Sequence, residues 1–186
     1  MPAARAPDDG FRPSTEKEEI LIMSGKLLIP MTALLIGTLC GCATAKVSQT
    51  EKTQSGIEKV CNFLKHTKVY YLATVDGDQP RVRPFGTVML YEGKLYIQTG
   101  RKKNVSRQIA KNGKVELCAF DGKCWLRLTG TLVDDNRRAA KAAMLDLHPG
   151  LKKMYSPDDN NTQVLYFKNA TAVFNTFGGK PVTVKF

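Results

Sequence analysis

The residues best able to do chemistry form a basic cluster in the middle of the chain. Arg101, Lys102 and Lys103 are consecutive, and Arg107 and Lys111 follow them. The cluster is too short for a nucleic-acid-binding arm, and we expect no nucleic-acid partner. It is better suited to a local phosphate site, because ammonium and guanidinium groups are strong donors to phosphate oxygens. A solvated basic face is an equally good interpretation of the charge as a whole, which is formally +11.

Other residue types that support catalysis are sparse. His66 and His148 are the only histidines and are far apart. Each lies near the expected end of a helix, where a positive charge is favoured by the helix dipole. Few serines lie near them, so we predict neither a Ser-His-Asp triad nor a metal site. The chain also has no G-x-G-x-x-G sequence and no P-loop, so the usual dinucleotide and triphosphate folds are not indicated.

The five cysteines do not form a framework. Cys40 and Cys42 belong to an N-terminal leader, which leaves Cys61, Cys118 and Cys124. An odd number without metal-ligand spacing argues against disulfides and against a zinc site. Cys118 lies in an apolar segment, and we predict that it is a core thiol.

The leader contains the elements of an export signal. Lys26 precedes an apolar run over 27–39, which is too short to cross a bilayer as a helix. The following Leu39-Cys40-Gly41-Cys42 resembles the bacterial lipobox. This resemblance implies lipidation of Cys42 and a membrane anchor in the bacterial cell envelope. An ordinary signal peptide or an uncleaved anchor are the alternatives, and the protein would be cytoplasmic if the leader is not used.

The leader also bears on where translation begins. A signal peptide starts close to its initiator, and the polar residues 1–22 ahead of Met23 do not fit that rule. We therefore expect Met23 to be the true start, with the signal peptide over about 23–41. The whole leader covers 1–41, a polar tether covers 42–56, and a single globular domain covers 57–186.

Strands and turns dominate the globular part. Apolar residues at helical spacing predict one amphipathic helix over 56–66. Asp76-Gly77-Asp78 and Glu92-Gly93 predict hairpin turns, and Pro84 indicates an edge strand or a bulge. Short helices are expected at 105–111 and 136–147. The predicted strands cover 69–75, 81–91, 94–99, 115–120, 124–133, 164–174 and 182–186. This order predicts a mainly β fold, closed or nearly closed into a barrel.

Several segments together resemble the pyridoxamine 5'-phosphate oxidase-like family. They are residues 71–75, 79–86, 93–100, 102–105 and 124–130, in matching order and spacing. The similarity covers nearly all of 57–186. It implies a six-stranded antiparallel split β-barrel with short flanking α-helices. It also implies that FMN binds at the interface of a homodimer.

The resemblance assigns flavin contacts to two strands. Arg83 matches the arginine that begins the flavin-contacting segment, in which backbone groups of Pro84 to Val88 run along the isoalloxazine edge. Gln98 and Thr99 match two contact residues on the next strand. For Arg83, a surface ion pair is the alternative.

The resemblance also assigns the phosphate end. Lys102 and Lys103 match the basic pair that holds the FMN phosphate, and a helix starting near Asn104 would direct N–H groups the same way. Trp125 falls where the oxidases carry a glutamine that reaches the flavin from the other subunit. Core packing is an equally good interpretation of Trp125, whereas a solvated turn is the alternative for the two lysines.

Function follows from the resemblance in outline. We expect an FMN-dependent oxidoreductase of unknown small-molecule substrate, such as a relative of the nitroimidazole reductases of this fold. The alternatives are a non-enzymatic flavin-binding or electron-transfer module and a haem- or deazaflavin-binding relative. The C-terminal basic segment with which the oxidases bind pyridoxal phosphate has no counterpart at 180–185, so true pyridoxamine-phosphate oxidase activity is not expected.

Overall fold

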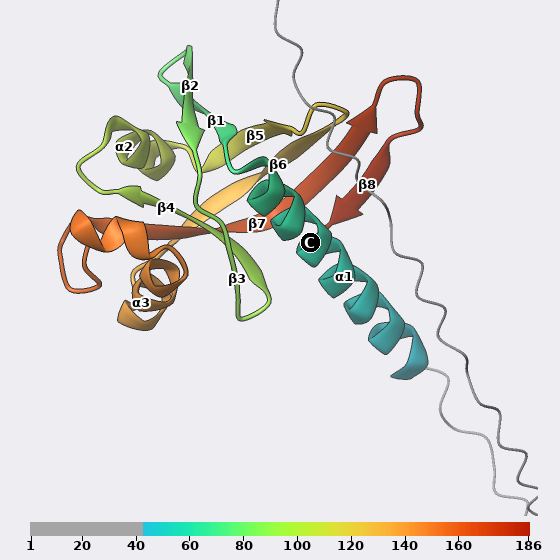
Figure 1. Ribbon diagram of the computed structural model, residues 1–186, viewed down its shortest axis with the longest axis horizontal. Helices are drawn as coiled ribbons and strands as arrows, with labels where there is room; N and C mark the ends of the chain where they lie inside the picture. The colour runs from blue at the N-terminus through green and yellow to red at the C-terminus, as the bar shows by residue number, and fades with distance from the viewer. Residues whose placement is uncertain (1–42) are drawn as a thin grey trace, which may run out of the picture. The chain divides into compact units, whose positions relative to one another are not determined.

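The computed structural model describes residues 43–186, which form one antiparallel sheet with helices packed around it (Figure 1). The helices are α1 (Ala43–Thr67), α2 (Asn104–Lys111), α3 (Arg138–Leu147) and the 3₁₀ helix η1 (Pro149–Lys153). The strands are β1 (Tyr70–Asp76), β2 (Gln79–Phe85), β3 (Met89–Tyr91), β4 (Lys94–Gly100), β5 (Lys114–Phe120), β6 (Cys124–Asp135), β7 (Thr162–Thr176) and β8 (Val182–Lys185). None of the described helices is long and apolar enough to cross a membrane.

Two hairpin turns confirm the turn predictions. Gly77 joins β1 to β2 with a φ of 68°, a conformation that glycine adopts without strain. Glu92 and Gly93 join β3 to β4 with φ values of 47° and 71°. Two consecutive residues of positive φ are what a two-residue hairpin loop requires, because that backbone twist matches the twist of the strands.

The strand predicted over 81–91 is broken in two. β2 ends at Phe85 and β3 begins at Met89. The connecting residues 86–88 do not continue the pairing of β2 with β1 or that of β3 with β4. At Gly86, a Cβ atom would lie 3.1 Å from the carbonyl oxygen of Lys68, so this connection runs close to the end of α1. The connection lets the chain leave one edge of the sheet and start the other.

The sheet is open between those edges. Its strand order is β2-β1-β5-β6-β7-β4-β3, with β8 also paired to β7. The fold is therefore the predicted mainly β split-barrel type, but the sheet has eight strands instead of six and does not close. The edge position of β2 explains how Pro84 is tolerated, since a strand with one free edge can lack an N–H donor there.

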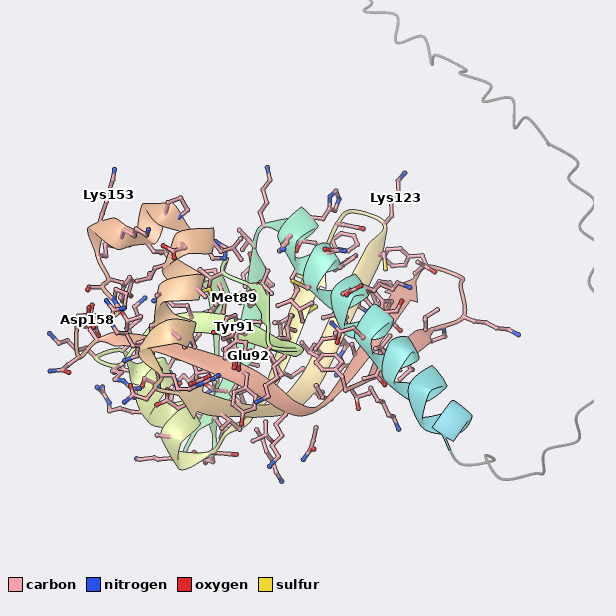
Figure 2. All side chains as sticks on the ribbon, turned by 90° about the horizontal axis from the view of Figure 1, so that it is seen from below. Met89, Tyr91, Glu92, Lys123, Lys153 and Asp158 are labelled. Atoms are coloured by element: carbon pink, nitrogen blue, oxygen red, sulfur yellow. The ribbon has the colours of Figure 1, made fainter. Side chains whose placement is uncertain are left out.

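The main core lies between α1 and the inner face of the sheet. Ile57, Val60, Cys61 and Leu64 form the buried stripe of α1, as their spacing predicted. They pack against inward-facing residues of β1, β4, β5, β6 and β7. Figure 2 shows β3, with Met89 and Tyr91, beside α3, where Met89 belongs to a second, smaller core cluster.

Two local predictions differ from the structure. Helix α1 begins at Ala43, so most of the segment expected to be a polar tether is helical. Cys118 is exposed and not in the core, because the alternation along β5 turns it outward while Leu117 and Ala119 point inward. Cys61, on the buried stripe of α1, is the core thiol, and burial raises its pKa.

Candidate functional site

The turn between β4 and α2 carries the two lysines of the predicted phosphate site. Lys102 and Lys103 are both exposed, and Lys103 is the N-cap residue of α2. Neither forms an ion pair within the residues that the structure describes. The first turn of α2 has no acidic residue and no side-chain cap. The Ser106 N–H donates to the Lys103 carbonyl at 3.1 Å, whereas the N–H groups of Asn104 and Val105 have no partner among the described residues and are available to an anion.

Arg83 lies on β2 and points toward α2. Its guanidinium donates hydrogen bonds to Thr74 Oγ1 at 2.6 Å, to Gln108 Oε1 at 2.7 Å and to the Leu72 carbonyl at 3.3 Å. Burial lowers the pKa of Arg83, and the neighbouring charge of Arg81 lowers it further. An arginine nevertheless stays protonated at neutral pH, so the site keeps a fixed positive charge here.

Two adjoining cavities meet at Arg83. The smaller has a volume of about 190 Å³ and the larger about 580 Å³. Both are lined by Arg83, Lys103 and Val105. The smaller is completed by Pro84, Phe85, Gly86, Thr87, Gln98 and Thr99, and the larger by Asp76, Arg81, Lys102, Asn104 and Gln108. The smaller cavity is thus lined mainly by residues of β2, β4 and the 86–88 connection, and the larger is rich in positive charge.

The 86–88 connection is held from three sides. The fully buried Tyr70 donates its hydroxyl to the Thr87 carbonyl at 2.7 Å, and burial raises the pKa of that hydroxyl. Thr87 Oγ1 accepts the Gln98 N–H at 3.0 Å. His148 Nε2 lies 3.2 Å from the Val88 carbonyl, so this ring nitrogen carries a proton. The backbone that lines the smaller cavity is therefore fixed in position.

Two buried polar residues of β4 complete the smaller cavity. Gln98 donates its side-chain Nε2–H to the Thr99 carbonyl at 2.9 Å, which orients its amide. Thr99 is 2% exposed. Gln163 lies opposite Thr99 in the register of β4 and β7, and its buried Oε1 accepts no hydrogen bond within the described residues.

Most of the predicted site residues come together at these cavities. Arg83, Pro84, Gln98, Thr99 and Lys103 line the smaller one, and Lys102 lines the larger.

Three predicted residues lie elsewhere or outside the described part. The side chain of Val88 is 1% exposed, within the core, and its carbonyl is bound by His148. Trp125 lines neither cavity of its own chain and packs against Phe177 with 5.1 Å between ring centroids. Cys42 lies outside the described residues, so its lipidation stays a prediction. Within residues 43–186 no group of His, Cys, Asp and Glu side chains could hold a metal ion.

Several polar residues in or beside the two cavities were not predicted as site residues. Gln108 had a signal, because it lies on the buried stripe of α2 with Val105 and Ile109, where an apolar residue is usual. Thr74 and Asn161 had none, since their roles depend on the approach of distant segments. Asn161 lies 59 residues after Lys102 in the chain, and its Oδ1 accepts the Lys102 N–H at 3.2 Å.

Comparison with known proteins gives a family. Residues 57–174 match the family model described as pyridoxamine 5'-phosphate oxidase. A NimC/NimA family protein from Clostridium acetobutylicum is 42% identical, with a TM-score of 0.72 over 75% of this chain and 98% of that chain. No curated protein matches the chain.

More distant structures share the fold. A protein related to general stress protein 26 of B. subtilis, from Clostridium acetobutylicum, is 18% identical with a TM-score of 0.56, over 72% of this chain and 96% of that one. A heme binding protein from Mycobacterium smegmatis is 17% identical with a TM-score of 0.55, over 70% and 57%. The matched residues run from within α1 nearly to the end of β7 and so include every strand but β8, and the chain belongs to the pyridoxamine 5'-phosphate oxidase family.

Proposed function

We propose that the protein binds FMN in the two adjoining cavities and acts as an FMN-dependent oxidoreductase on a small-molecule substrate. The observation that carries the proposal is the junction at Arg83 and Lys103. One cavity there is lined mainly by residues of β2, β4 and the 86–88 connection, and it adjoins another lined by four cationic residues. A phosphorylated flavin has the same two-part chemistry, an aromatic ring system at one end and an anion at the other.

The larger cavity suits the phosphate of FMN. A phosphate monoester carries nearly two negative charges near neutral pH. Lys102 and Lys103 supply ammonium donors, and the N–H groups of Asn104 and Val105 at the start of α2 can add to them. Asp76 is the one carboxylate of this cavity, and it lies 3.8 Å from Arg81 in an ion pair.

The smaller cavity suits the edge of the isoalloxazine ring. Its apolar walls, which include Pro84, Phe85 and Val105, would exclude water from one part of the ring. Gln98, Thr99 and the fixed backbone at Gly86 and Thr87 offer hydrogen-bonding groups at another. When bound, FMN supplies the redox chemistry, and the residues of this chain bind and orient it.

We further propose that the protein is a homodimer that pairs through the outer face of the sheet. Tyr71, Cys118 and Phe120 are exposed on this face, and strand register places Trp125 beside Phe120. A group of exposed apolar side chains across neighbouring strands is typical of an interaction surface. Pairing there would give Trp125 a route to the flavin of the partner, the role that the family resemblance assigns to it.

A visible spectrum of the purified protein tests the cofactor. We expect flavin absorption bands, either as isolated or after FMN is added and the excess is removed. Bleaching by NAD(P)H and reoxidation by a nitroimidazole would support the oxidoreductase. A Soret band would replace FMN with haem, and the absence of any retained flavin would end the proposal. Retained FMN that no donor and acceptor pair turns over would leave a binding or electron-transfer module.

A further inference from the structure

The turn between β4 and α2, which carries Lys102 and Lys103, is hydrogen-bonded to the loop that precedes β7. The Arg101 N–H donates to the Asn161 carbonyl at 2.7 Å, and the Lys102 N–H donates to Asn161 Oδ1 at 3.2 Å. Gly100 precedes these two residues, and a Cβ atom there would lie 3.1 Å from both Asn161 Oδ1 and Tyr155 Oη. The loop and the turn therefore touch without room for a side chain between them.

Asn161 is itself held in place by Asp159. Asp159 Oδ1 accepts the N–H groups of Asn161 at 3.0 Å and Thr162 at 2.5 Å, and Oδ2 accepts the Ser156 N–H at 3.0 Å. Burial opposes ionisation of this carboxyl, but the N–H donors outweigh it and lower its pKa to about 2. The loop is thus closed by a charged acceptor and presents Asn161 in one orientation.

Arg101, the third cation of the turn, points away from the two cavities. The Arg101 guanidinium binds both oxygens of Asp134, at 2.6 and 3.1 Å, and Asn136 Oδ1 at 2.9 Å. This anchors the turn to the end of β6 and keeps Arg101 out of both cavities. Of the three consecutive cations, only Lys102 and Lys103 reach the larger cavity.

We propose that Asn161, oriented by Asp159, is a positioning residue that sets the preference of the site for FMN over unphosphorylated riboflavin. The inference rests on the proposed FMN function. By fixing the Lys102 backbone, Asn161 makes the two lysines and the start of α2 converge on one anion. A turn that is fixed before binding loses less conformational entropy when it binds a phosphate. This raises the affinity for FMN but not for riboflavin, which has no phosphate.

The test compares two flavins on one variant. Asn161→Ala removes the Oδ1 acceptor but keeps the carbonyl that binds Arg101. We expect its dissociation constant for FMN to rise about five- to tenfold, the effect of one lost hydrogen bond, while that for riboflavin is unchanged. Both are measured by quenching of flavin fluorescence, with a thermal melt to show that the variant is folded.

A neighbouring loop residue provides the matched control. Asp158 is exposed and pairs with Arg138, and Figure 2 shows it at the periphery of the molecule. Asp158→Asn should leave both flavin affinities unchanged.

Three results would overturn the inference. If affinities for FMN and riboflavin fall together in Asn161→Ala, the residue has only a structural role. If the variant keeps the full preference for FMN, Asn161 does not position the turn. If the wild-type protein itself does not distinguish the two flavins, the phosphate assignment fails, and the proposed function and this inference fail with it.

Discussion

At the scale of residues, Arg83 is the link between the two halves of the site. It lines both cavities, and its hydrogen bonds tie Thr74 of β1 to Gln108 of α2. Because the guanidinium is committed to these partners, Arg83 holds α2 in place while contributing charge. The two lysines are then the donors left for a phosphate, since neither forms an ion pair within the described residues.

Replacing Lys103 with alanine should weaken FMN binding by roughly 1.5–3 kcal/mol, the usual scale for a charge-assisted hydrogen bond. Isothermal titration with FMN measures the change. Lys111→Ala is the control, because Lys111 is an exposed cation at the opposite end of the same helix. If Lys103→Ala binds FMN as tightly as the wild type, Lys103 does not belong to the site.

Whether these residues could be predicted from the sequence depends on how far along the chain their partners lie. Lys102 and Lys103 stand together in a local motif, so the family resemblance could assign both to the proposed phosphate site. Gln98 and Thr99 could be placed by their strand. Asn161 could not, because its partner at Lys102 is brought close only by the pairing of β4 with β7.

At the scale of elements, a polar network joins three strand ends to the start of α3. The buried Asp135, at the end of β6, accepts hydrogen bonds from Arg137 and from the hydroxyl of Tyr96 on β4. Arg137 also donates to Glu92, in the β3–β4 turn, at 2.8 Å. The hydrogen bonds from Arg137 lower the pKa of Asp135 to about 2.

This network predicts how stability depends on acid. The pKa of Asp135 is below its unfolded value of 3.8, so its ionised form stabilises the fold above about pH 4. That contribution should be lost as the pH falls from about 4 to about 2. It is worth about 2 kcal/mol, since one pKa unit corresponds to about 1.4 kcal/mol. Urea unfolding at a series of pH values measures it.

Two variants separate this network from the general effect of acid. Asp135→Asn should be less stable at neutral pH and should lose less stability on acidification. Asp146→Asn is the control, since Asp146 forms an exposed pair with Lys152. An acid-dependent loss in Asp135→Asn as large as in the wild type would show that another group is responsible.

The elements themselves were predicted unevenly. The turns at Gly77 and Glu92-Gly93 contain a glycine that can adopt the positive φ they need, so both hairpins could be predicted from the sequence. The break at 86–88 did not, because Thr87 and Val88 are good strand formers. Hydrogen bonds from Tyr70 and His148, both distant in sequence, fix the backbone of residues 86–88 in this irregular conformation.

At the scale of the whole molecule, the outer sheet face gives the dimer proposal a direct test. Phe120 is 53% exposed on that face. Phe120→Glu would place a charge in the contact and should raise the dimer dissociation constant tenfold or more, as expected for a disrupted aromatic anchor. Light scattering across a dilution series reports the mass.

Lys123→Glu also introduces a glutamate, at the tip of the β5–β6 hairpin, where Figure 2 shows the side chain extending outward, and should leave the mass unchanged. A wild-type protein that is monomeric at micromolar concentration would contradict the dimer. If Phe120→Glu becomes monomeric and also loses FMN affinity, the partner chain contributes to the site.

The length and place of β7 determine when the molecule can assemble. β7 pairs with β4, β6 and β8, so it joins both halves of the sheet. β7 begins at Thr162, so it is synthesised after both β4 and β6. Until then β4 and β6 have an unpaired edge each, and such edges invite aggregation of the nascent chain. The inner edges of β4 and β6 therefore stay open to other chains until β7 has been synthesised and has paired with both.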